Sequence, residues 1–113
     1  MRSLRALLRL LAFGLIETIP PRDRTVTRIG ITETRIRAYW STHGRLPGSL
    51  EDLVPLEGRD NATIDGWGRP IQYDVTPPST VTLTSLGADS FRGVEGPSET
   101  VQVTFQADRP RGA

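Results

Sequence analysis

The side chains that could act in acid–base catalysis are few, and they are scattered along the chain. The candidates are Asp65, Asp89, Glu95, Glu99 and His43. No pair of them has a recognisable nucleophile–base spacing, and a single histidine makes a histidine-based triad improbable. The sequence contains no cysteine, which excludes disulfides, thiolate catalysis and cysteine-based zinc sites. We therefore expect a protein that is not an enzyme.

Length and composition point to one small domain. The chain has 113 residues, of which 36% are hydrophobic and 24% charged, and its formal net charge is +1. Such a length suits a single core, whereas the 11 glycines and 9 prolines predict many turns. A nucleic-acid-binding domain normally carries a concentrated basic face, so the near-neutral charge argues against nucleic acid as a partner.

The first element that must position these side chains is a long helix. The apolar residues at mostly three- and four-residue steps are Val26, Ile29, Ile36 and Trp40. This spacing predicts a helix over about 24–43, capped by Asp23 and ended by Gly44. Ser49 then caps a short second helix. The expected apolar contacts of this second helix are Leu50, Leu53 and Val54.

From residue 65 onward the apolar pattern changes from helical to alternating. It predicts strands over 70–75, 81–86 and 101–105, the first two joined by a tight proline-rich turn as a hairpin. A long loop with glycine and acidic residues separates the last two strands. The expected fold class is α+β, with a long N-terminal helix packed on a small three- to four-stranded antiparallel sheet.

The N-terminal segment differs in charge from the rest. Residues 1–24 hold five arginines against two acidic residues, and their leucines fall on one helical face. The uncharged apolar run 10–16 is too short to span a bilayer, and we expect Pro20 and Pro21 to end any helix there. Residues 1–22 are thus a basic amphipathic, leader-like segment: a weak signal peptide, an interfacial helix or a helix lying on the domain. The domain follows at 23–107, with a flexible tail at 108–113.

Three motifs in order carry a resemblance to a known family. Residues 65–73, DGWGRPIQY, resemble the D-P-W-G-x-P-Y-x-Y signature of the type II secretion major pseudopilins. Residues 85–89, SLGAD, resemble the segment that precedes the family's glycine-rich acidic loop, and 45–53, RLPGSLEDL, resemble the stretch after its long helix. The signature positions present here are Asp65, Trp67, Gly68, Pro70 and Tyr73. We interpret Trp67 and Tyr73 as core aromatics that hold a loop on the sheet.

The resemblance implies a pilin-like fold and a calcium site in the loop after the second strand. The implied ligands are the carbonyl of Leu86 with Asp89, Glu95, Ser98 and Glu99. Calcium prefers six to eight oxygen ligands. The chain departs from the family where Ser98-Glu99-Thr100 replaces D-A-D. The alternative is a loop closed by hydrogen bonds from Asp89 and Ser98 to backbone amides, with Arg92 as a counter-ion.

The N-terminus resembles the family only in part. Phe13 and Glu17 reproduce the spacing of the first and fifth mature residues, and Ala12 occupies the position before the peptidase cleavage site. The uninterrupted apolar helix that follows in the family is absent. The resemblance implies leader cleavage at Ala12, Phe13 and Glu17.

The resemblance implies a structural subunit of the pseudopilus, in the bacterial cell envelope at the inner membrane and periplasm. Its partners would be other pseudopilin subunits and inner-membrane proteins of the secretion system, with membrane association through the N-terminus. The alternative function is a soluble pilin-fold binding module that does not polymerise.

Overall fold

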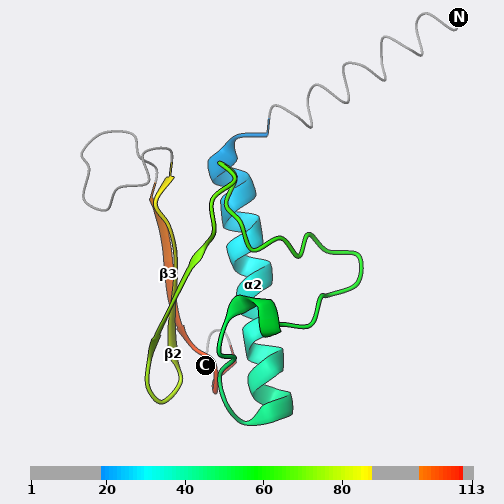
Figure 1. Ribbon diagram of the computed structural model, residues 1–113, viewed down its shortest axis with the longest axis vertical. Helices are drawn as coiled ribbons and strands as arrows, with labels where there is room; N and C mark the ends of the chain where they lie inside the picture. The colour runs from blue at the N-terminus through cyan, green and yellow to red at the C-terminus, as the bar shows by residue number, and fades with distance from the viewer. Residues whose placement is uncertain (1–18, 88–99, 111–113) are drawn as a thin grey trace, which may run out of the picture.

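The computed structural model describes residues 19–87 and 100–110. They form helix α2 (Pro21–His43), the 3₁₀-helix η1 (Leu50–Asp52) and strands β1 (Gln72–Thr76), β2 (Thr80–Ser85) and β3 (Val101–Gln106). The strands make one antiparallel sheet in the order β1-β2-β3, and α2 lies along it (Figure 1). This confirms the α+β fold and the predicted hairpin of the first two strands.

Helix α2 begins earlier than expected and by a different mechanism. Its first residue is Pro21, Pro20 is its N-cap residue, and no side chain caps it. The predicted cap at Asp23 is therefore wrong. Proline suits the first helical position because that N–H has no intrahelical acceptor and proline already has a helical φ. The expected boundary between residues 22 and 23 falls inside α2.

The end of α2 is as predicted. Gly44 has a φ of 68°, in the left-handed region, and its N–H donates to the carbonyl of Trp40 at 2.7 Å. Glycine adopts this conformation without the steric cost that a Cβ brings, so the helix stops here.

The buried stripe of α2 is partly built from threonine. Ile29 and Ile36 are fully buried, together with Thr25 and Thr32. Each threonine hydroxyl donates to the carbonyl four residues earlier, at 2.7 and 2.8 Å, which lets a polar side chain be buried. Val26, by contrast, is 46% exposed, so it does not belong to the buried stripe although it fits the apolar spacing of the helix.

The sheet turns its apolar side chains toward α2. Val81 and Leu83 of β2 are fully buried, and Val101 and Phe105 of β3 are nearly so. Strand β1 begins at Gln72, two residues later than expected. The preceding Ile71 is buried, but Val75 is exposed near the end of this edge strand.

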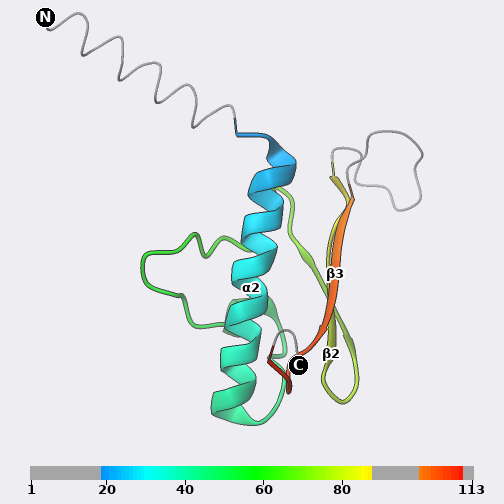
Figure 2. The same cartoon turned by 180° about the vertical axis from the view of Figure 1, so that it is seen from behind.

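Residues 53–64 lie on the side of α2 opposite the sheet (Figure 2). The expected second helix is a single 3₁₀ turn, η1, in which Asp52 accepts a hydrogen bond from the Ser49 N–H at 3.2 Å. Leu50 and Leu53 are buried as predicted, whereas Val54 is 72% exposed because the chain is extended after η1. Within 19–87 and 100–110, no helix is long and apolar enough to cross a membrane.

Candidate functional site

The turn over residues 65–69, at the start of the signature segment, is organised by one buried carboxylate. Asp65 is 2% exposed. Its Oδ1 accepts hydrogen bonds from the backbone N–H groups of Trp67 and Arg69, both at 2.9 Å. Its Oδ2 accepts one from Ser85 Oγ at 2.8 Å. A buried carboxylate is tolerated only when such donors replace water, so these three bonds explain how Asp65 can be buried.

The same turn is held against the first turns of α2. The Gly66 N–H donates to Thr25 Oγ1 at 2.7 Å, and Arg28 Nη1 donates to the Asp65 carbonyl at 3.2 Å. A Cβ on residue 66 would collide with the backbone of Pro21. Glycine at position 66 thus permits a contact between turn and helix that no other residue would allow.

The two aromatic residues of the signature have different environments. Tyr73 packs against the core, and its hydroxyl donates to the Pro47 carbonyl at 2.7 Å. Burial is the main factor that raises the pKa of this hydroxyl. Trp67 is half-buried and is not part of the core cluster, so the interpretation of Trp67 as a core aromatic is wrong. Trp67 lies in the tight turn around Asp65, and the Trp67 side chain is outside the core between sheet and helix.

The remaining signature residues shape the backbone. Gly68 has a φ of 85°, and its N–H donates to the Asp65 carbonyl at 3.1 Å. Pro70 is exposed and forms an isolated bridge with Ile64 immediately before β1. Gly68 therefore closes the turn, and Pro70 leads into the edge strand.

The three segments that carry the family resemblance contact one another. Tyr73 of the signature donates to Pro47 in segment 45–53, and Asp65 accepts from Ser85 at the start of segment 85–89. These residues are 20 or more positions apart in the chain. The motifs therefore form one continuous structural unit rather than three separate turns.

Most of the expected calcium site lies outside the described residues. This applies to Asp89, Glu95, Ser98 and Glu99, and also to Ala12, Phe13 and Glu17 of the expected cleavage site. Leu86 is described, and its carbonyl accepts a hydrogen bond from Thr100 Oγ1 at 3.4 Å. Leu86 also borders a cavity of about 300 Å³ that Asp65 and Arg69 help to line.

The described part of the chain, 19–87 with 100–110, contains no group of three histidine, cysteine or acidic side chains that could hold a metal ion. Both carboxylate oxygens of Asp65 already accept hydrogen bonds. The calcium prediction thus depends on the acidic residues of the loop, which lie outside the described residues. Leu86 is the one expected ligand that the structure describes.

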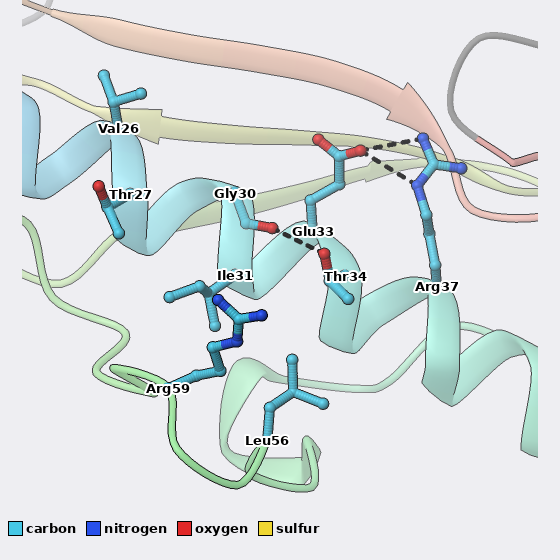
Figure 3. Close-up of a pocket in the computed structure, with 9 residues that line it drawn as sticks. All are labelled: Val26, Thr27, Gly30, Ile31, Glu33, Thr34, Arg37, Leu56 and Arg59. Atoms are coloured by element: carbon cyan, nitrogen blue, oxygen red, sulfur yellow. Dashed lines mark hydrogen bonds and ion pairs between the residues drawn. The ribbon is translucent and has the colours of Figure 1, made fainter.

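A groove on the outer face of α2 was not foreseen from the sequence. It has a volume of about 460 Å³ and lies between the helix and residues 56–59 (Figure 3). Its lining residues are Val26, Thr27, Gly30, Ile31, Glu33, Thr34, Arg37, Leu56 and Arg59. Ile31 lies outside the three- and four-residue spacing that predicts the helix, but Val26 lies within it, so that spacing gives no signal for the groove.

Two of the charged side chains that border the groove are paired with each other. Glu33 and Arg37 form an i,i+4 ion pair at 3.1 Å (Figure 3). Arg37 also donates to the Gln106 carbonyl of β3 at 2.9 Å. The Arg37 guanidinium lies 5.0 Å from the centre of the Phe105 ring. This pair therefore connects α2 to the sheet, which is more than the solvated pair that spacing alone indicates.

Comparisons of the chain with protein-family models, with curated proteins and with solved structures find no significant match.

Proposed function

We propose that the protein is a non-enzymatic structural subunit resembling the major pseudopilin of type II protein secretion. It would act in the bacterial cell envelope, at the inner membrane and periplasm, with other subunits and inner-membrane secretion proteins as partners. The observation that supports this best is the contact among the three resembling segments, through Tyr73 with Pro47 and Asp65 with Ser85. The bonds are made by side chains of the resembling segments themselves.

A subunit of this kind works through its surfaces. The outer face of α2 offers an open surface with apolar residues, because Val26 is 46% exposed and Gly30 leaves space beside it. Exposed apolar groups next to polar ones are typical of protein–protein contacts. We propose that another copy of the subunit contacts this face during assembly.

The absence of cysteine makes a direct crosslinking test available. Full-length Val26→Cys would be produced in bacteria that carry a type II secretion system and treated with a short bismaleimide. We expect covalent dimers in the membrane fraction, because each chain then carries a single thiol. The matched variant is Asp74→Cys, on edge strand β1 and away from α2, and the unsubstituted chain is the negative control.

The outcome separates the two candidate functions. Crosslinked species from Val26→Cys alone would support assembly through α2. Only monomer, recovered in the soluble fraction, would contradict assembly and favour the soluble pilin-fold binding module. Equal crosslinking from Asp74→Cys would mean that the products are random collisions and would also contradict a contact specific to α2.

A further inference from the structure

A second cavity lies near the C-terminal end of α2, on the side that faces residues 54–56. Its volume is about 250 Å³. Its lining residues are Arg35, Ala38, Tyr39, Thr42, His43, Val54 and Leu56. Leu56, labelled in Figure 3, borders both this cavity and the groove on the outer face of α2. The signature turn does not contribute to it.

Arg35 gives this cavity a buried positive charge. The residue is only 6% exposed. Its Nε, Nη1 and Nη2 each donate one hydrogen bond, to the carbonyls of Val54 (3.1 Å), Asn61 (2.8 Å) and Leu53 (3.2 Å). All three acceptors are neutral, and the described residues hold no carboxylate within ion-pair distance of Arg35. Burial accordingly lowers the pKa of Arg35.

Two N–H donors of Arg35 remain. A guanidinium has five N–H groups, and three of them are used by the carbonyls. One N–H on Nη1 and one on Nη2 therefore have no acceptor among the described residues. A carboxylate binds arginine more strongly than a neutral acceptor does, because both partners are charged.

The other walls of the cavity suit an apolar group. Ala38, Val54 and Leu56 provide aliphatic surface. The rings of Tyr39 and His43 are stacked with their centres 4.0 Å apart. His43 Nδ1 lies 3.1 Å from the Tyr39 carbonyl, which fixes the position of the imidazole ring. The cavity thus combines one buried cation with a mostly apolar lining, the common composition of a small-molecule site.

We propose that this cavity binds a small apolar carboxylate, whose carboxylate group accepts hydrogen bonds from the two remaining N–H groups of Arg35. Its apolar part packs against Val54, Leu56 and the stacked rings. The ligand supplies the negative charge that the described surroundings of Arg35 lack. This inference is independent of the proposed role in secretion.

The test is an NMR titration of the isotope-labelled full chain with benzoate. We expect saturable shifts of backbone amide signals at residues 35–43 and 54–56, with a dissociation constant of about 1 mM, as suits so small a ligand. Benzamide, which has the same ring but no charge, should bind at least tenfold more weakly. Absent or non-saturable shifts, or equal binding of benzamide, would overturn the proposal.

Two variants localise the binding. Ala38→Phe fills the cavity and leaves the three carbonyl bonds of Arg35 in place, so it should weaken benzoate binding at least tenfold. Gly30→Ala, in the separate groove of Figure 3, should bind as the unsubstituted chain does. Unchanged affinity in Ala38→Phe would refute the site.

A titration with peptides distinguishes two sources of such a carboxylate, the C-terminus of a polypeptide and a free organic acid. A tetrapeptide ending in leucine with a free C-terminus is compared with its C-terminal amide. Tighter binding of the free peptide than of benzoate would identify the C-terminus of a polypeptide as the occupant. Tighter binding of benzoate would identify a free organic acid.

Discussion

At the scale of single residues, Asp65 has the widest structural effect in the signature turn. Its carboxylate accepts two backbone N–H bonds within its own turn and one hydroxyl bond from β2. It therefore joins the turn to the sheet, while its carbonyl accepts from Arg28 of α2. Asp65, one of the few side chains considered for acid–base chemistry, is thus engaged in holding the fold together.

Replacing Asp65 with alanine should destabilise the domain strongly. The substitution leaves the buried N–H groups of Trp67 and Arg69 and the hydroxyl of Ser85 without their acceptor, so we expect a loss of about 3 kcal/mol in the free energy of unfolding. Urea unfolding followed by circular dichroism measures it. Asp74→Ala, at an exposed carboxylate on β1, should change stability by less than about 0.5 kcal/mol. Equal losses in the two variants would refute the role of Asp65.

Two glycines should respond in opposite directions to alanine. Gly66→Ala forces a Cβ into the backbone of Pro21, so it should cost about 2 kcal/mol or more. Gly30 lies within α2, and a Cβ there would meet no packed neighbour within 4 Å, so Gly30→Ala should stabilise the helix by about 0.5–1 kcal/mol. Melting temperatures of both variants test this. A stable Gly66→Ala would mean that the turn does not contact α2 this closely.

At the scale of elements, α2 is the one on which the others are assembled. Its buried stripe packs against the sheet, while Arg35 and Arg28 bind residues 53–64 on the opposite side. Asn61 completes that segment by accepting from the Leu56 N–H and donating to the Leu56 carbonyl, at 2.7 and 2.8 Å. A loop without regular structure is thereby held by side chains in place of a hydrogen-bonded ladder.

The ion pair of Arg28 with Asp60 predicts that the attachment of residues 53–64 to α2 depends on pH. The pKa of Asp60 is lowered, first by the hydrogen bond from Arg28 at 2.9 Å. A carboxyl group with a lowered pKa stabilises the fold above its ordinary pKa of 3.8, and this contribution disappears as the pH falls through the lower folded value. Because Asp60 is exposed, the effect should remain below about 1 kcal/mol.

Urea unfolding at pH 7, 5 and 3 measures this contribution. The unsubstituted chain should lose more stability between pH 5 and 3 than Asp60→Asn does, whereas Asp74→Asn should follow the unsubstituted chain. Identical pH profiles for Asp60→Asn and the unsubstituted chain would show that the ion pair contributes nothing.

At the scale of the whole molecule, the calcium prediction is tested by thermal stability. The full chain would be melted in calcium and in excess chelator. A ligand that binds only the folded state adds about 2.7 kcal/mol at 100 times its dissociation constant, which is a shift of several degrees for a domain of this size. Asp89→Ala should abolish the shift. An equal melting temperature in both conditions would favour the loop closed by its own hydrogen bonds.

Local patterns in the sequence determined the elements of this protein. Two strands were placed correctly from apolar residues that alternate with polar ones. Val81 and Leu83 share one face of β2, as Val101 and Phe105 do in β3, because every second side chain of a strand faces the same side. Gly44 correctly placed the end of α2, because its left-handed conformation is a local property. The fold class followed from the order of these elements.

The tertiary structure decided which polar groups are buried and what they bind. Arg35 binds carbonyls 18 to 26 residues away, and Asp65 and Gly66 are fixed by Ser85 and Thr25, 20 and 41 residues distant. Periodicity does not encode such partners, because they depend on how the loops return to the helix. For the same reason the exposure of Val26 and Trp67, and the groove and cavity along α2, became evident only once the chain was folded.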